Sequence, residues 1–436
     1  MTTLSRRTLL KMTALAGGGL AGAGALSACG GVGGAASGGS EPLRYAMWGN
    51  NVRQQNYQKA FEQMQAAMPD LQIAMEFADY TAFQERMTTQ MAARTVADVF
   101  WVPSAQVMTY ADNGLYRNLD GLETLDLSDY SESDLEGFKL GGELNTMPFG
   151  IFVPAMRYNV TFAEEDGVEL PEDGPGWTWD SLAEFARDYS ANNSSGRKAL
   201  SYGAEHDLSF ENWLRQRGEQ LWTEDGRIGF TEDGLASWID WWEALRTAEA
   251  TTSIGEQDGV APDWPTIGDK ILMNFGNSNH IIDDAKQFPD YEFALRHPPV
   301  DPAAEPGFQY LYFPRMAIYS GTDDETAATA GRVLTYCTST VEMLEAVGLT
   351  MGAPVNPRVA EEVKAIASPD EVEMLDLVAE DRALDRRPRY EAPAGSSTWR
   401  TVMGRVLEEV TLGDSTPSKA AADLIAEVGA AIDRAA

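Results

Sequence analysis

The sequence has few of the residues that build disulfides, metal sites and nucleic-acid-binding surfaces. Its 436 residues include only two cysteines, Cys29 and Cys337, and three histidines, which do not have the spacing of a metal-binding motif. Lysine and arginine number 33 against 67 aspartates and glutamates, a net charge of −34. Such a charge opposes binding to nucleic acid and to anionic lipid surfaces. We therefore expect no metal, no cofactor and no nucleic-acid partner.

Recognisable catalytic motifs are missing as well. The chain contains no Gly-x-Ser-x-Gly elbow and no phosphate-cradling glycine loop. Its many carboxylates leave a secreted glycoside hydrolase open as an alternative, because that chemistry needs a pair of them. The hydrophobic fraction of 44% and the 11 tryptophans are ample for packed cores. We expect a folded protein that is not an enzyme.

Long hydrophobic runs are also lacking. The run from Met12 to Leu26 is short, rich in glycine and interrupted by Gly17-Gly18-Gly19, so it is a weak candidate for a membrane-spanning helix. Arg6, Arg7 and Lys11 precede it and small residues follow it, which predicts an export signal peptide over residues 1–28. The stretch with the two arginines resembles the twin-arginine export motif. An ordinary secretory signal with two arginines is the alternative.

The end of this signal, Leu26-Ser27-Ala28-Cys29, resembles the lipobox of bacterial lipoproteins. In that family the chain is cut before the cysteine, whose thiol carries diacylglycerol, and the new amino terminus is acylated, for which we expect palmitate. Cys29 is thus the predicted lipidation site, and residues 29–40 form the lipidated cysteine and a flexible glycine-rich linker of roughly 18 Å r.m.s. reach. We expect a lipid anchor on the extracellular face of the cell membrane.

The folded part begins with alternating strand and helix patterns. The patterns predict strands over 43–48, 71–77 and 96–102 and helices over 54–68, 80–93 and 107–113. This order predicts a parallel sheet with helices on both faces, in which ligands bind beyond the carboxyl ends of the strands. The residues at those ends make Trp48, Asn50, Asp79 and Ser104 candidate ligand contacts.

Further segments, taken in order, resemble one known family. They are the apolar stretch 147–159 ending in Tyr-Asn, the helix start 177–182 with Asp180 as its cap, the aromatic segment 210–213, and the segments 267–277, 348–355 and 412–420. Together with the lipobox they resemble extracellular solute-binding protein family 1, the maltose-binding-protein-like lipoproteins of carbohydrate ABC importers. The resemblance covers roughly residues 43–433.

This resemblance implies an α/β, two-lobed periplasmic-binding-protein-like fold with crossover hinge strands and a ligand cleft between the lobes. Lobe one would comprise residues 41–151 plus 313–355, and lobe two residues 152–312 plus 356–436. The implied function is to capture a sugar, a di- or oligosaccharide, and deliver it to ABC transporter permease subunits in the membrane. We expect a monomer. A non-sugar solute such as a glycerophosphodiester or an oligopeptide is the alternative for the same fold.

A sugar site needs aromatic rings and polar groups that bond paired hydroxyls. The candidate aromatic contacts are Trp48, Phe149, Phe210, Tyr310 and Trp399, and the candidate polar contacts are Asn50, Asp79, Ser104, Asn277, Ser278, Asn279 and Arg400. Arg400 stands where the family has a second aromatic residue, and Gly276-Asn277-Ser278 also lacks the family's aromatic. These departures favour a di- or trisaccharide over a long malto-oligosaccharide.

Other conspicuous residues have a structural interpretation. Trp238, Trp241, Trp242 and Leu245 share one helical face and are predicted to be core. Cys337 is predicted to be a small buried hydrophobe without a disulfide partner. The basic cluster Arg386–Arg389 is expected to form ion pairs within the fold, with contact to the transporter as the alternative.

Overall fold

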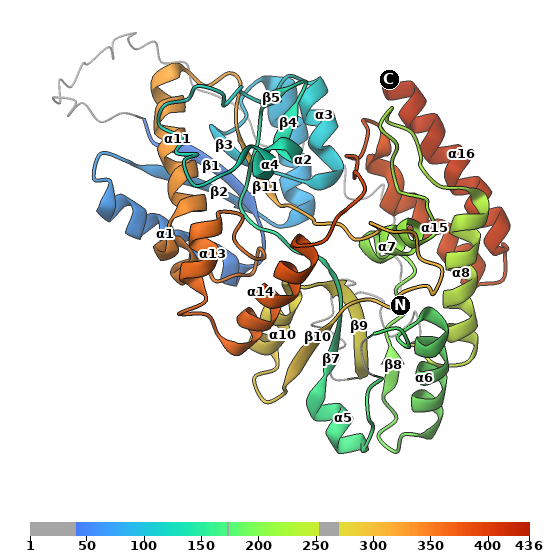
Figure 1. The fold of residues 1–436 in the computed structure, drawn as a ribbon. Coiled ribbons are helices and arrows are strands. Elements are labelled where there is room, and N and C mark those ends of the chain that lie inside the picture. The colour runs from blue at the N-terminus through green and yellow to red at the C-terminus, as the bar shows by residue number, and fades with distance from the viewer. Residues whose placement is uncertain (1–40, 172–173, 253–269) are drawn as a thin grey trace, which may run out of the picture. The chain divides into compact units, whose positions relative to one another are not determined.

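The structure is a computed structural model that describes residues 41–171, 174–252 and 270–436. The predicted signal peptide, Cys29 and the linker lie outside these ranges. Within the described ranges, no helix is both long enough and apolar enough to cross a membrane. The two main sheets each form the centre of one lobe (Figure 1).

Five strands form the sheet of the first lobe, in the order β2-β1-β3-β11-β6. Their bounds are β1 Leu43–Trp48, β2 Ile73–Ala78, β3 Val99–Val102, β6 Met147–Pro148 and β11 Arg315–Ile318. Strand β1 is parallel to β2 and β3, whereas β11 is antiparallel to β3 and β6. The predicted third strand starts three residues too early, because Val96 and Ala97 are buried without strand pairing.

Side chains at the ends of the first two strands start the helices that follow. Asn50 caps α1 (Asn51–Ala67) by accepting a hydrogen bond from the Arg53 N–H, and Asp79 caps α2 (Tyr80–Ala93) by accepting one from the Ala82 N–H, both at 2.9 Å. The other helices of this lobe are α3 Val107–Asp112, α4 Glu132–Leu135, α11 Asp324–Ser339 and α12 Val341–Val347, with a short β4–β5 pair, Lys139–Leu140 and Glu143–Leu144.

Cys337 on α11 lies buried in this lobe's core, as predicted.

The sheet of the second lobe has the order β10-β7-β9-β8. Its strands are β7 Pro154–Asn159, β8 Lys198–Leu200, β9 Ile271–Asn277 and β10 Phe293–Arg296. Strand β7 is antiparallel to both of its neighbours, whereas β8 is parallel to β9. Polar residues that leave the ends of β7 and β9 therefore lie at opposite ends of adjacent strands.

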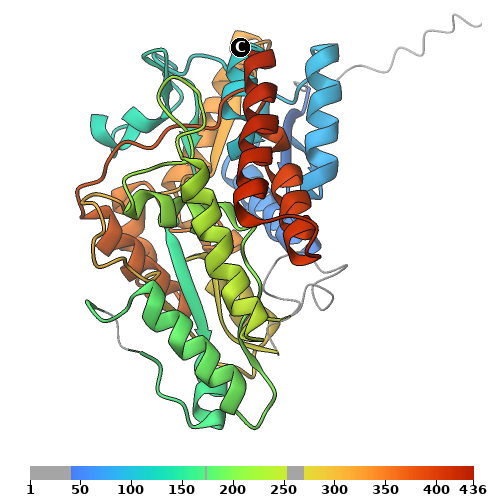
Figure 2. The same ribbon diagram turned by 90° about the vertical axis from the view of Figure 1, so that its right-hand side faces the viewer.

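Helices cover this second sheet and form a separate layer beside it. They are α5 Val160–Asp166, α6 Trp179–Asn192, α7 Asp207–Gln216, α8 Glu232–Thr247, α10 His280–Gln287, α13 Pro357–Val363, α14 Pro369–Arg382, α15 Trp399–Thr411 and α16 Pro417–Ala435. Helix α16 packs against α8 and α15, as Figures 1 and 2 both show. Trp238, Trp242 and Leu245 are fully buried in the core of this lobe, which confirms their predicted core role, while Trp241 is partly buried.

The cap of α6 differs from the prediction. Thr178, not Asp180, is the N-cap: its hydroxyl accepts a hydrogen bond from the Ser181 N–H, and the Ser181 hydroxyl accepts one from the Thr178 N–H. Asp180 lies two residues after the cap, in the first turn of the helix, where its negative charge stabilises the helix amino terminus without capping it.

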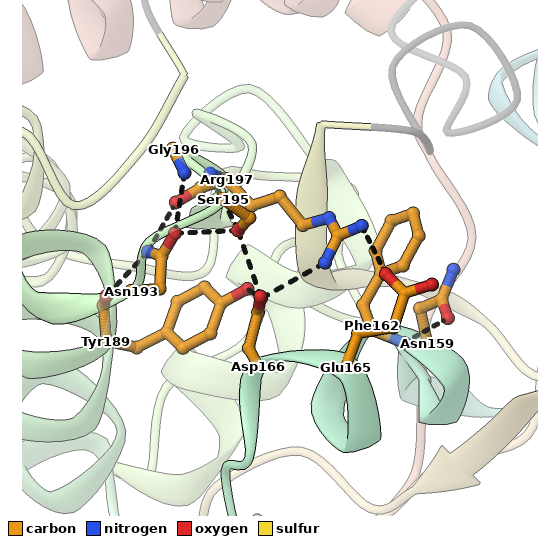
Figure 3. Close-up of polar contacts among 9 residues, drawn as sticks. All are labelled: Asn159, Phe162, Glu165, Asp166, Tyr189, Asn193, Ser195, Gly196 and Arg197. Atoms are coloured by element: carbon orange, nitrogen blue, oxygen red, sulfur yellow. Dashed lines mark hydrogen bonds and ion pairs between the residues drawn. The ribbon is translucent and has the colours of Figure 1, made fainter.

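A polar cluster ties together loops of the second lobe (Figure 3). The Asp166 carboxylate accepts hydrogen bonds from the Tyr189 hydroxyl at 2.6 Å and from the Ser195 hydroxyl at 3.1 Å, and forms an ion pair with Arg197. Arg197 also pairs with Glu165 and lies 3.6 Å from the centre of the Phe162 ring. Because these groups bind one another, we interpret the cluster as a structural contact that joins α5, α6 and the loop before β8.

Three chain segments run between the lobes side by side. Phe152 and Tyr312 exchange backbone hydrogen bonds of 3.0 and 2.9 Å, and Ile151 and Ala353 exchange two of 2.7 Å. Gly352 makes this approach possible, because a Cβ there would lie 2.1 Å from the carbonyl oxygen of Ile151. The predicted two-lobed fold with crossover strands is thus confirmed, whereas the residue boundaries assigned to the lobes stay a prediction.

Candidate functional site

An ion pair between two helices of the second lobe marks the candidate site. Nη2 of Arg400, near the start of α15, lies 2.9 Å from Oδ2 of Asp207, the first residue of α7. The Leu208 N–H donates to the other Asp207 oxygen at 3.1 Å and so fixes the carboxylate. The Arg400 side chain is nevertheless 66% exposed. Its guanidinium therefore keeps N–H groups that can bond a ligand.

Two tyrosines, one from the first lobe and one from an interlobe segment, lie near this ion pair. The pKa of Arg400 is raised, mainly by Asp207 and further by Tyr80 and Tyr312. Tyr80 is the first residue of α2, and Ser104 lies close enough to Tyr312 to lower the pKa of its hydroxyl. Burial raises the pKa of Tyr312 to about 12, so its hydroxyl stays protonated at neutral pH. Tyr80, Ser104, Asp207, Tyr312 and Arg400 define what we call the interlobe boundary.

The predicted residues at the strand ends of the first lobe lie beside Tyr80. The Trp48 ring is partly buried and meets the Tyr80 ring edge-on, with centroids 5.4 Å apart. Asn50 and Asp79 are exposed, and each uses one side-chain oxygen to cap a helix. Their remaining polar atoms can bond a ligand at this edge, which is the carboxyl end of parallel strands.

The loop before α7 adds two titratable side chains that the sequence interpretation missed. Burial lowers the pKa of His206 to about 4, and its Nδ1 accepts the Ser209 N–H at 3.2 Å. His206 is therefore neutral at physiological pH. Glu205 is exposed, yet the partial loss of solvent around its carboxyl group raises the pKa of that group. The charge of Asp207 raises this pKa further, whereas the charge of Arg400 lowers it. A carboxylate beside a guanidinium suits the paired hydroxyls of a sugar.

Three of the predicted aromatic contacts, Phe210, Trp399 and Tyr310, are buried in this structure. Phe210 is 0% exposed and stacks against Trp399, which is 5% exposed. Tyr310 is 2% exposed and donates its hydroxyl proton to the Leu208 carbonyl at 2.7 Å. In this structure these rings offer no face to a ligand. They support the backbone that carries Asp207 and Arg400.

The predicted polar residues after β9 are mostly used within the fold. The Ser278 hydroxyl accepts a hydrogen bond from the Val153 N–H at 3.2 Å, and the Asn279 amide donates to the Thr350 carbonyl at 2.7 Å. Both residues thereby fasten the end of β9 to the interlobe segments. Asn277 is partly buried at the end of β9, and the partly buried Phe149 ring packs against Trp101 with centroids 4.7 Å apart.

The basic cluster 386–389 forms ion pairs and hydrogen bonds within the fold, as expected. Arg389 makes a two-pronged contact with Glu211, of 2.8 Å from Nε and 2.9 Å from Nη2. Arg386 donates to backbone carbonyls, and the Arg387 N–H donates to Gly307 at 2.9 Å. The structure thus gives Arg386, Arg387 and Arg389 partners inside the protein.

The sequence patterns identified one side of the interlobe boundary better than the other. Asp79 was a candidate, yet its neighbour Tyr80 was not, although it too lies at a strand end. Asp207 opens α7 three residues before the aromatic residue that was chosen, Phe210. The available signal was the position of each residue at a helix start, where side chains face the end of a sheet.

Two pockets lie away from the interlobe boundary. One lies in the first lobe behind Phe149 and is lined by residues such as Tyr45, Met316 and Cys337. The other is bordered by α12, α13 and α14. Among the described residues, no group of three histidine, cysteine or acidic side chains could hold a metal ion.

Comparison with known proteins gives a consistent result. The sequence model of a family described as bacterial extracellular solute-binding protein matches residues 57–373, well over half of the chain. A solved extracellular solute-binding protein family 1 member from Alicyclobacillus acidocaldarius is 22% identical, with a TM-score of 0.66, over 90% of this chain and 99% of that one.

Two further solved structures share the fold. A periplasmic oligogalacturonide binding protein from Yersinia enterocolitica, in complex with saturated digalacturonic acid, is 18% identical with a TM-score of 0.78, over 90% of this chain and 99% of that one. The GacH receptor of Streptomyces glaucescens, studied with acarbose, is 17% identical with a TM-score of 0.73, over 90% of this chain and 98% of that one.

Proposed function

The chain belongs to the bacterial extracellular solute-binding proteins, and from this premise we propose that it captures a di- or oligosaccharide for an ABC importer. The sugar would bind at the interlobe boundary and contact both lobes. Binding that favours one arrangement of the lobes shifts the population toward it, and no covalent chemistry is required. The carbohydrate ligands named for the Yersinia and Streptomyces proteins support a sugar as the solute.

One observation carries the proposal. The exposed guanidinium of Arg400, held by Asp207, lies near tyrosines of the first lobe and of an interlobe segment. Charge-assisted donors, a carboxylate and neutral tyrosine hydroxyls are the groups that recognise vicinal sugar hydroxyls. A ligand bonded to Arg400 and Tyr80 at once would link the lobes.

A thermal-shift screen against mono-, di- and trisaccharides tests this function. A ligand at 100 times its Kd stabilises the protein by ~2.7 kcal/mol, which such a screen detects. We expect Arg400→Gln to weaken binding of the ligand found by roughly 10- to 100-fold, because it removes a charge-assisted donor. Arg405→Gln is the matched control, since Arg405 lies on the same helix but pairs with Glu409 and Glu427.

The rival functions give different outcomes. Equal affinity of the parent and Arg400→Gln would place the site elsewhere. A stabilising glycerophosphodiester or oligopeptide, with no response to sugars, would replace the carbohydrate with another solute. Release of product from an oligosaccharide in an overnight digest would support a glycoside hydrolase instead.

The location of the protein follows from the same proposal. Membership of an extracellular family implies export. We propose that the twin-arginine signal provides the export route and that acylated Cys29 holds the mature chain at the membrane near its permease. The linker of roughly 18 Å r.m.s. reach would let the lobes reorient for docking.

A further inference from the structure

A segment that begins and ends in the second lobe reaches the first lobe between its ends. Residues 383–398 join α14 to α15. Helix α14 packs against α10 and β10, and α15 packs against α16, so both flanking helices belong to the second lobe. We propose that residues 383–398, together with Arg382 at the end of α14, form a non-covalent connection, here called the strap, that holds the two lobes together.

Two ion pairs join the strap to the first lobe. Glu391 pairs with Arg315, the first residue of β11, and the exposed fractions of the two side chains are only 19% and 7%. Arg382, at the start of the strap, pairs with Asp134 on α4 at 2.7 Å. At the other end, the short helix Ser396–Thr398 contacts the short helix Ser104–Gln106 that follows β3.

The strap is fixed just as firmly to the second lobe. Arg389 contacts the buried carboxylate of Glu211 on α7 through two hydrogen bonds. Arg215, also on α7, donates to the carbonyls of Arg387 and Pro388 at 2.8 and 3.0 Å. Because the strap cannot slide on the second lobe, its ion pairs with Arg315 and Asp134 act between the lobes.

The ion pairs Glu391–Arg315 and Arg382–Asp134 oppose rotation of one lobe against the other, because each joins the strap to the first lobe. The crossover pair Phe152–Tyr312 provides the connection about which the lobes could rotate. A rotation that separated Glu391 from Arg315 would leave a largely buried charge without its partner, which is unfavourable. The strap therefore favours the arrangement seen here, in which the short helix Ser396–Thr398 contacts the short helix Ser104–Gln106. Any effect of the strap on ligand affinity rests on the proposed function, whereas its stabilisation of one lobe arrangement does not.

Distance measurement between spin labels on the two lobes tests the strap without any ligand. Labels would be placed at Thr89→Cys on α2 and Glu408→Cys on α15, both exposed, in the full chain carrying Cys29→Ser. We expect Glu391→Gln to add a population with a longer interlobe distance. Glu76→Gln is the matched control, because Glu76 is 21% exposed and pairs with Arg44 inside the first lobe.

The outcomes separate the strap from general damage and from the proposed function. A second variant, Asp134→Asn, should lengthen the distance in the same direction, and the double variant more than either alone. Unchanged distances in all three variants would overturn the proposal, as would an equal change in Glu76→Gln. Because no sugar is present, failure of the sugar screen leaves this result standing, and the reverse also holds.

Discussion

The Trp399 and Phe210 rings lie nearly parallel, with their centroids 6.1 Å apart and an angle of 9° between their planes. One ring comes from α15 and the other from α7. Their contact brings the starts of these helices together, where Arg400 and Asp207 form their ion pair. The two aromatic residues thus determine the position of the candidate site without facing it.

Replacing Trp399 with alanine should therefore reduce stability strongly. A large-to-small change at a buried tryptophan costs ~3–5 kcal/mol in the free energy of unfolding, to be measured by urea denaturation. Leu412→Ala, whose side chain is among the most exposed large hydrophobic ones at 68%, should change it by less than ~0.5 kcal/mol. If the Trp399→Ala protein kept its stability and lost only ligand binding, the Trp399 ring would be a ligand contact rather than a core residue.

The Arg389–Glu211 ion pair predicts a second large effect. Glu211 is 2% exposed, so Glu211→Gln should destabilise the protein by ~3–5 kcal/mol, because Arg389 keeps a buried charge without its partner. Glu409→Gln, which breaks the exposed pair with Arg405, should cost at most ~1 kcal/mol. Equal melting temperatures for the two variants would contradict this internal role of Arg389.

His206 predicts how stability changes with pH. Its folded-state pKa of about 4 lies below the value of about 6.5 expected for the unfolded chain. The unfolded chain therefore takes up the proton first, and this group lowers the free energy of unfolding as the pH falls from about 6.5 to about 4, by of order 1–3 kcal/mol. Urea denaturation across this range should show the loss.

The control for this pH effect is His206→Asn, which can still cap α7 but does not titrate. Its stability should vary less between pH 4 and 7 than that of the parent. The same slope in both proteins would mean that His206 has no part in the pH dependence.

The predicted anchor is tested separately from the binding site. Cys29→Ser should release the exported protein from the membrane and abolish uptake of its ligand, because no thiol remains for lipid. Its affinity for the ligand in solution should be unchanged. A loss of affinity would show that the anchor and the site are coupled.

The sequence was most informative where local chemistry determines structure. The helix Tyr80–Ala93 was predicted with both ends correct, because Asp79 caps its start and the amphipathic pattern then continues without interruption. The core role of Trp238 and Trp242 followed from helical spacing alone. Such features depend on a few neighbouring residues and need no knowledge of the tertiary fold.

The candidate site was less accessible because it depends on packing between distant segments. Phe210 and Trp399 lie 189 positions apart in the printed sequence, and only their stacking shows that both are core. Arg400 was identified, but its partner Asp207 was not, since no local pattern joins α15 to α7. The same reason hid the contact between Glu391 and Arg315.

Cys337 has a practical consequence for how this protein can be made. It is the one cysteine within residues 41–171, 174–252 and 270–436, it is buried and unpaired, and burial raises the pKa of its thiol to about 12. The described fold therefore needs no oxidant to form, and its thiol stays protonated and unreactive at neutral pH. Both lobes can fold in a reducing compartment before any passage across a membrane.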